Sequence, residues 1–358
     1  MKMQNGEHGS KKKSKSSGGF IKDTFIISKN DTAQRKTGKI ISIIALVLIV
    51  ASIVLGGLMI SKYVIAKINN DNMEDLIPTS EVSSDAGVSG TDGEGVIAPT
   101  PDEFDKDGIL LGLSDLYQLN NEVIGWINIP GTKLDYPVAK RPNNEDPKIA
   151  NGYYLNHTLE KKINPFGTPF SDYRATFANG YQSANVTIYG HNSKSGDFFE
   201  TVKYYKDIEF YKENPIINFD TIYGKGQYKV IGRFTEFVDP NQPFFAYHDF
   251  VDFNPNAADA VQNAEAQARH NEFMTELGKR NYYESGVDVK FGDNFITLST
   301  CNDEIQGAQD TPYRDVLVAR KVRPGEDATV DVSKIQKNTD VIMPAGWIKK
   351  FGKENPYK

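Results

Sequence analysis

The sequence holds one cysteine, Cys301, and its position suits a nucleophile. It ends the segment FITLSTC, residues 295–301, whose β-branched and apolar composition predicts a strand. Side chains alternate along a strand, so Phe295, Thr297, Ser299 and Cys301 are expected on one face. A free thiol is mostly protonated at neutral pH, so nucleophilic work needs a base or a positive neighbour. The alternative interpretation is a small buried apolar residue.

Five histidines could supply the base. His191 follows NVTIYG and is expected at a strand end, as Cys301 is. Two strand ends can meet in a barrel, so His191 is the first candidate, and His157, in a loop after YYLN, is the second. The remaining three are His8 in the N-terminal tail, His248 in an aromatic loop and His270 in a predicted helix.

An acyl transfer also develops negative charge on the carbonyl oxygen, and a fixed donor stabilises that charge. Arg314 lies 13 residues after Cys301, directly before the predicted strand DVLVARKV. Arg320 and Arg323 compete with it for the role. At ~3.3 Å per residue, Arg320 lies roughly 20 Å further along the strand, so both cannot serve one site. The sequence favours Arg314, the alternative being a surface arginine in an ion pair.

Neither a metal nor another cofactor is expected. The His and Cys residues do not cluster at the spacings of zinc sites. The acidic runs at 102–107 and 303–304 lack the pattern of a calcium-binding EF-hand loop.

Short strands dominate the part of the chain that must position these residues. One long helix is expected at 257–279, before the strand of the cysteine, with shorter helices at 110–121 and 198–205. Strands are expected at 123–129, 133–139, 186–189, 216–220, 228–237, 295–301 and 315–322. Without βαβ alternation, this pattern predicts a mainly β fold. The expected architecture is a closed barrel of about eight strands, with an N-terminal helix and a long helical insertion.

The N-terminal part reads as a membrane anchor. Residues 1–39 carry ten Lys/Arg against three Asp/Glu and are expected to be a disordered cytoplasmic tail. Residues 40–61 are expected to be a transmembrane helix, since residues 40–60 hold no charge and can cross a ~30 Å hydrocarbon core. A secretory signal peptide would have a shorter apolar run of about 7–15 residues. The expected location is the cell membrane, with a single pass and the catalytic domain outside the cell.

The rest of the chain divides into three expected parts. Residues 62–107 are rich in Ser, Gly and Asp and are expected to be a flexible linker. Residues 108–324 are the expected catalytic domain, and residues 325–358 are an extension of unknown role. The whole chain has a net charge of −6, so the part after residue 39 carries about −13. An acidic body argues against nucleic-acid binding.

The motifs together resemble the sortase family. TLSTC followed by an arginine that opens the next strand is similar to the sortase signature, and IYGHN supplies a histidine upstream. The segments at 123–158 and 190–221, and the long helix, resemble class B sortases. The resemblance covers roughly residues 110–323. Two features depart from it: Asn302 stands where related enzymes often have an acidic residue, and the Cys-to-Arg loop is a little long.

The resemblance implies a cysteine transpeptidase that acts on surface proteins with a C-terminal sorting signal. The Cys301 thiolate would attack the carbonyl of a Thr in that signal, His191 would protonate the leaving amine, and Arg314 would stabilise the oxyanion. An amine of a peptidoglycan precursor, or of a pilin, would then resolve the thioacyl-enzyme. Ser299 and Thr300 would line the peptide groove.

Three alternatives remain at this point. The first is a sortase that polymerises pilins. The second is another kind of secreted cysteine hydrolase. A papain-like enzyme has its cysteine near the mature N-terminus and its histidine downstream, whereas here the order is reversed. The third is a membrane-tethered binding module that is not an enzyme.

Overall fold

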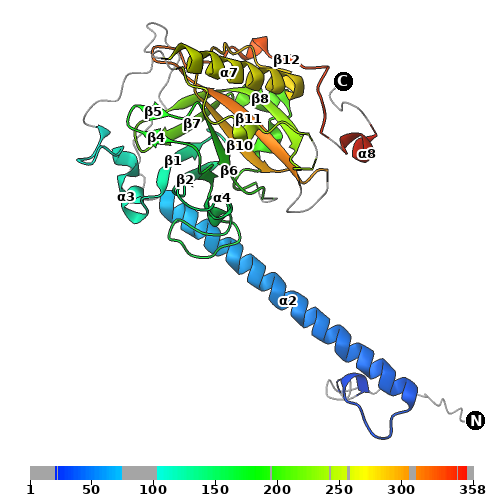
Figure 1. Cartoon of the computed structure of the whole chain (residues 1–358). Helices are drawn as coiled ribbons and strands as arrows, with labels where there is room; N and C mark the ends of the chain where they lie inside the picture. Colours follow the sequence, from blue (N-terminus) through cyan, green and yellow to red (C-terminus); the bar gives the residue numbers. More distant parts are fainter. Residues whose placement is uncertain are drawn as a thin grey trace, which may run out of the picture. The chain divides into compact units, whose positions relative to one another are not determined.

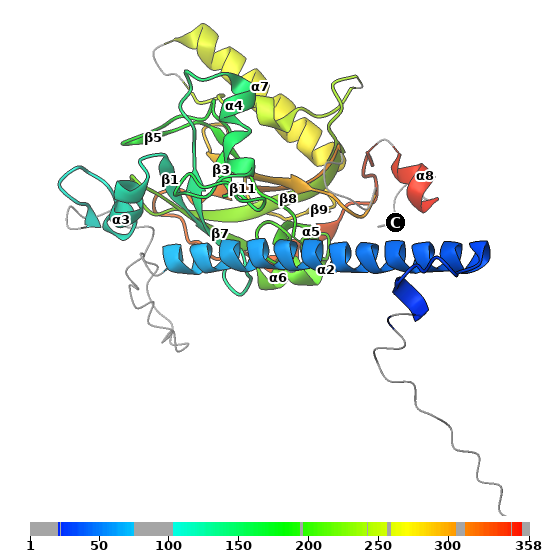
Figure 2. The same ribbon diagram turned by 90° about the horizontal axis from the view of Figure 1, so that it is seen from below.

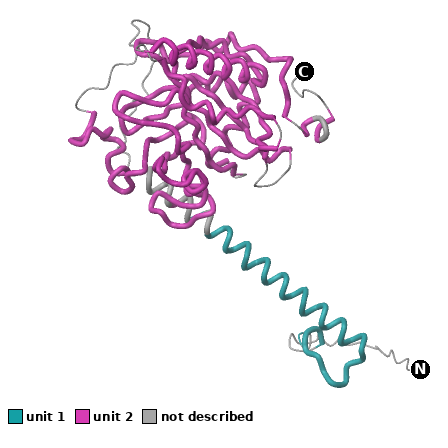
Figure 3. The backbone as a smooth tube through the Cα atoms, viewed as in Figure 1, with its two compact units in different colours: residues 1–64 teal, residues 65–358 magenta. Residues whose placement is uncertain are grey.

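The computed structural model describes residues 21, 23–74, 103–193, 196–241, 243–255, 259–305, 312–344 and 346–352. The chain divides into two compact units, Met1–Val64 and Ile65–Lys358 (Figure 3). The first unit holds most of a long apolar helix, and the second holds the barrel.

Eight strands form a closed barrel in the order β1-β2-β3-β6-β10-β11-β8-β7. The pairs β2–β3 and β6–β10 are parallel, and the other neighbours are antiparallel. The barrel strands are β1 (Val123–Asn128), β2 (Asp135–Ala139), β3 (Phe170–Ser171), β6 (Asn185–Tyr189), β7 (Ile216–Thr221), β8 (Gln227–Phe237), β10 (Phe295–Cys301) and β11 (Tyr313–Lys321). The expected barrel is confirmed, and closure leaves it no free edge strand.

Figure 1 labels most of the remaining elements. Two small sheets pair β4 with β5 and β9 with β12. Their strands are β4 (Phe177–Ala178), β5 (Tyr181–Gln182), β9 (Tyr283–Glu284) and β12 (Gln336–Lys337). The α-helices are α2 (Ala33–Glu74), α3 (Leu111–Leu119), α4 (Pro147–Ala150), α5 (Thr201–Tyr204), α6 (Ile208–Glu213), α7 (Ala260–Arg280) and α8 (Trp347–Phe351). Short 3-10 turns are η2 (Tyr153–Leu155), η3 (Tyr247–Asp249) and η4 (Val332–Lys334).

Alternation along β10 separates two hydrophobic clusters. Ile296 and Leu298 point into the barrel, where they pack with side chains of the other strands and of α5 and α6. Phe295 points outward, into a second cluster with Phe273 and Leu277 of α7. Because both faces are covered, β10 is buried along nearly its whole length. The strand that carries Cys301 is therefore a rigid support.

The long helix α7 covers the outside of the barrel beside β8 (Figures 1 and 2). It was expected at 257–279 and is observed at Ala260–Arg280. Asp259 begins it, because its carboxylate accepts from the backbone N–H groups of Val261 and Gln262. Lys279 and Arg280 in the last turn complement the negative end of the helix dipole.

Helix α2 contains one segment that could span a membrane. The segment Ala33–Ser61 has 29 residues, and an 18-residue window within it has a mean hydropathy of 3.0 and no buried residue. It begins seven residues earlier than the expected 40–61, and α2 continues to Glu74, into the segment expected to be a linker. The rest of that expected linker, residues 75–102, and most of the expected tail, residues 1–20 and 22, lie outside the described residues.

Packing continues on both sides of the expected catalytic domain, residues 108–324. At the N-terminal side, Phe104 pairs with Leu110 and packs against the cluster below α3, so the folded part begins before residue 108. At the C-terminal side, the chain after residue 324 belongs to the same body. Val330, Val332 and Ile335 pack against the main core, and β12 pairs with β9. These segments pack against partners that are distant in sequence, and they show no helix or strand periodicity of apolar residues. Their place in the fold could therefore not be predicted from local patterns.

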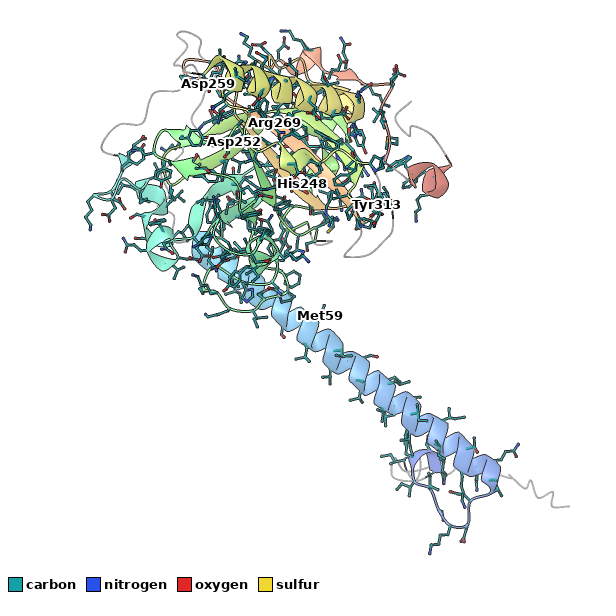
Figure 4. All side chains as sticks on the ribbon, viewed as in Figure 1. Met59, His248, Asp252, Asp259, Arg269 and Tyr313 are labelled. Carbon is teal, nitrogen blue, oxygen red and sulfur yellow. The ribbon has the colours of Figure 1, made fainter. Side chains whose placement is uncertain are left out.

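The C-terminal segment packs against Tyr313, the first residue of β11. Trp347 of α8 is 3% exposed and packs with Ile305 and Tyr313. Figure 4 labels Tyr313 near α8. Val341 is also buried, as expected from its apolar character, whereas Ile342 is 51% exposed.

Candidate active site

Three neighbouring chain segments bring the candidate residues together. In the antiparallel β10–β11 pair, Cys301 lies directly opposite Arg314. In the parallel β6–β10 pair, Ser299 lies opposite Tyr189, which ends β6 two residues before His191. Directly paired residues of adjacent strands have Cβ atoms about 4.5–5.5 Å apart. Cys301 therefore lies between the histidine segment and the arginine strand.

The register continues past the end of β6 through specific bonds. The N–H of Gly190 donates to the carbonyl of Ser299 at 3.2 Å, and Thr300 Oγ1 donates to the carbonyl of Gly190 at 2.7 Å. Asn192 Nδ2 donates to the carbonyl of Cys301 at 2.9 Å. The residues on both sides of His191 are thus bonded to β10.

Close packing explains why a glycine precedes His191. A Cβ at Gly190 would lie 2.6 Å from ring atoms of Phe199, closer than real Cβ contacts allow. The carbonyl of His191 in turn accepts from the N–H of Phe199 at 2.9 Å. Phe199 therefore fixes the direction in which the chain leaves the strand.

The imidazole of His191 is half-exposed, and it has one hydrogen-bond partner among the residues that the structure describes. Its Nε2 lies 2.7 Å from the carbonyl oxygen of Leu155. A carbonyl only accepts, so Nε2 carries a proton. In the neutral ring, the lone pair is then on Nδ1, which is the nitrogen left for proton transfer.

Arg314 and Cys301 share an electrostatic environment. Both side chains are half-exposed. Burial raises the pKa of Tyr247 to about 12, while its bond to Ser299 and the charge of Arg314 lower it and Cys301 raises it. Arg314 Nη1 also donates to the carbonyl of Tyr313 at 3.0 Å, which restrains the guanidinium.

Ser299 and Thr300 have partners inside the protein. Each is 2% exposed. The hydroxyls of Ser299 and Tyr247 lie 2.8 Å apart, and Thr300 is bonded to Gly190. These contacts support the strand ends around Cys301, and the expected role of the two residues in lining the peptide groove stays a prediction.

The other candidates from the sequence lie elsewhere. His157 stacks on Tyr153 with ring centroids 4.0 Å apart, and its Nδ1 bonds to the carbonyl of Tyr153 at 2.7 Å. Arg320 pairs with Phe295 at the opposite end of β10, and its buried guanidinium forms an ion pair with the half-buried Glu326. Arg323 binds Asp293 and Asp288. The strand register therefore favours Arg314 over both arginines.

Two contributors to the site were not found by sequence reasoning. Asn192 bonds to Cys301, and Tyr247 bonds to Ser299 from the outer layer. Asn192 stood beside His191 in the motif GHN, which was a usable signal. Tyr247 lies in an aromatic segment whose packing partner the sequence does not reveal. Among the described residues, no group of three or more His, Cys, Asp or Glu could hold a metal ion.

Comparisons with known proteins point to one family. Sortase B of Staphylococcus aureus is 30% identical over 208 residues, which cover 58% of this chain and 73% of that protein. Sortase B of Listeria monocytogenes is 29% identical over 192 residues, 54% of this chain and 68% of that protein. The crystal structure of the S. aureus enzyme has 27% identity and a TM-score of 0.47, covering 59% of this chain and 87% of that chain. No protein-family model matches the chain.

A cysteine at a strand end, with an arginine on one adjoining strand and a histidine after the other, has the groups that cysteine-dependent acyl transfer needs. The chain belongs to the sortase family, and its relatives are of class B. It is therefore a sortase-type cysteine transpeptidase.

Proposed function

We propose that the chain cleaves a C-terminal sorting signal after a Thr and transfers the resulting acyl group to an amine of a cell-wall precursor. Cys301 is the nucleophile, His191 the general acid and base, and Arg314 the oxyanion donor. One observation supports the proposal: Cys301 pairs with Arg314 in the β10–β11 register, and Asn192, the neighbour of His191, donates to the carbonyl of Cys301.

The first half-reaction forms a thioester. The Cys301 thiolate attacks the Thr carbonyl carbon, and Arg314 donates to the oxyanion that develops. The C–N bond then breaks, and the leaving amine takes a proton from His191. Arg314 also offsets the cost of holding a thiolate, since a nearby positive charge favours the charged form of a thiol.

The second half-reaction regenerates the enzyme. An incoming amine loses a proton to neutral His191 and attacks the thioester carbonyl. The C–S bond breaks, and the thiolate leaves. The net result is the exchange of one amide for another, with no oxidant, metal or nucleotide consumed.

The apolar segment Ala33–Ser61 suits a single membrane pass. The basic residues before it favour a cytoplasmic N-terminus, which places the barrel outside the cell. In that location both a sorting signal and a cell-wall precursor are within reach.

The test is product analysis with and without an amine. A sorting-signal peptide is incubated with the enzyme alone, then with oligoglycine or a peptidoglycan stem peptide, and products are identified by mass spectrometry. The proposal predicts an amide-linked product only when an amine is present. Release of free acid at the same rate in both reactions would instead indicate a hydrolase.

A further inference from the structure

The residue after each of two catalytic candidates is polar and buried. Asn302 follows Cys301, and Asp315 follows Arg314, and each is 1% exposed. Side chains alternate along a strand, so these two point away from the face of Cys301 and Arg314. Asn302 Nδ2 donates to Asp315 Oδ1 at 2.8 Å. One hydrogen bond thus connects the positions next to the nucleophile and the arginine.

Asn302 also fixes the backbone directly after Cys301. Its N–H donates to the carbonyl of Tyr313 at 2.9 Å, which extends the β10–β11 pairing by one bond. Its Oδ1 accepts from the N–H of Ile305 at 3.1 Å, which closes the turn that follows. These three bonds of Asn302 restrain the backbone that directly follows Cys301.

Asp315 is neutralised by an arginine from the next strand. Arg233, on β8, is 1% exposed, and its Nη2 lies 2.5 Å from Asp315 Oδ1. Its guanidinium also lies over the ring of Tyr282 at 4.8 Å. Thr235 Oγ1 donates to Asp315 at 2.9 Å and accepts from Arg233 Nη1 at 2.6 Å and from Tyr282 at 2.7 Å. The hydroxyl of Thr235 thus uses its one donor and both acceptor positions.

A buried ion pair is weak evidence for stability, because apolar residues of similar volume often serve as well. Its hydrogen bonds, however, are directional, so they can fix the relative positions of the strands that they join. Here they join β8, β10 and β11 at the end of the barrel that carries Cys301 and Arg314.

We propose that Asn302, Asp315 and Arg233 are positioning residues that hold Cys301 and Arg314 at a fixed separation. The proposal rests on the proposed roles of Cys301 and Arg314. It also gives a reason for the amide at residue 302: an acidic side chain there would place a second carboxylate against Asp315. The identities of residues 302 and 315 are therefore coupled.

The test is an exchange of the amide and the carboxylate. Asn302→Asp brings two carboxylates together, and Asp315→Asn leaves the buried charge of Arg233 without its partner. The combination of both changes restores one amide, one carboxylate and one counter-charge. We expect each single change to lower kcat by about 10- to 100-fold, as small misplacements of reacting groups do, with KM nearly unchanged. The combination should recover most of that loss.

Two further variants keep the result interpretable. Asn302→Ala leaves the Arg233–Asp315 pair intact and should fold while losing kcat, which covers the case in which the charged single variants do not fold. Asn294→Ala is the control, because Asn294 also bridges segments, donating to the carbonyls of Gln182 and Ser183 at the opposite end of β10 from Cys301. It should keep its kcat.

Two outcomes would overturn the proposal. One is folded Asn302→Ala with the kcat of the parent enzyme. The other is a double variant no better than the poorer single variant, since a merely structural role predicts no recovery of kcat by exchange. Failure of the proposed function itself would appear separately, as activity that survives Cys301→Ala.

Discussion

The side chains around Cys301 are selected by strand register rather than by closeness in sequence. Arg314 is 13 residues away and His191 is 110 residues away, yet Arg314 pairs with Cys301 and both neighbours of His191 bond to β10. The sequence predicted the strand ends that carry them. It also favoured Arg314 over Arg320 by distance along the strand, and the pairing of Arg320 with Phe295 agrees with that distance. Which strands pair with each other depends on contacts between residues far apart in sequence, so local sequence patterns could not predict it.

The histidine assignment can be tested by two matched substitutions. His191→Ala should lower kcat by about 10²–10⁴-fold, the usual contribution of a positioned acid or base. His157→Ala should keep most of its activity, because its ring stacks on Tyr153 and bonds to that residue's backbone. Steady-state cleavage of a fluorogenic sorting peptide measures both. Equal losses in the two variants would show that His191 has no special role.

Arg314→Lys should lose about 10²–10³-fold in kcat although the charge is kept. A guanidinium offers a planar fork of donors, whereas an ammonium on a flexible stem aims poorly at a developing oxyanion. Arg320→Lys is the comparison, and it should change stability but not kcat. Arg320 is fully buried and bonded to Glu326, so its replacement should lower the melting temperature while kcat is kept. Unchanged kcat in Arg314→Lys would remove Arg314 from the mechanism.

At the scale of elements, the strands and the long helix were predictable because their residues carry local patterns. β10 was expected at 295–301 and is observed there, and α7 differs from its expected bounds by only a few residues. The C-terminal segment was not predictable. Its contacts with β9 and α7, such as the bond from the N–H of Ile342 to the carbonyl of Lys279, are made to residues far away in sequence.

The end of that segment stabilises the chain on both sides of residues 306–311. Trp347 packs with Ile305 before them and Tyr313 after them. Trp347→Ala should cost about 3–5 kcal/mol in the free energy of unfolding, the usual range for a buried tryptophan. It should also lower kcat, because Ile305 and Tyr313 flank the turn after Cys301 and the start of β11.

Urea unfolding and peptide cleavage, both at a temperature where each variant is folded, measure the two effects. Ile342→Ala is the control, since Ile342 is 51% exposed and its loss should change stability by no more than about 0.5 kcal/mol. A Trp347→Ala variant as stable and as active as the Ile342→Ala variant would show that α8 does not support the site.

At the scale of the whole molecule, one apolar helix and one barrel are separate compact units (Figure 3). The residues proposed for catalysis all lie in the second unit. The first unit thus contributes location rather than chemistry.

This division predicts that the chain from residue 103 onward is soluble and keeps its kcat on a soluble peptide. It retains Phe104, which packs below α3. A chain that begins at residue 123 is the comparison: it lacks Phe104, Ile109, Leu110, Leu113 and Leu116, all members of one cluster, and should be far less stable. Aggregation or inactivity of the longer form would mean that the helix supports the fold.

The central claim is that acyl transfer passes through a thioester on Cys301. The most direct measurement is intact-protein and peptide mass spectrometry after brief mixing of the chain from residue 103 with a sorting peptide in the absence of an amine. The account predicts a mass increase equal to the N-terminal peptide fragment, located on Cys301, which disappears when an amine is added. Cys301→Ala, which removes only one half-exposed side chain, should stay folded and show neither the adduct nor cleavage. Continued cleavage by that variant, or an adduct on another residue, would contradict the account.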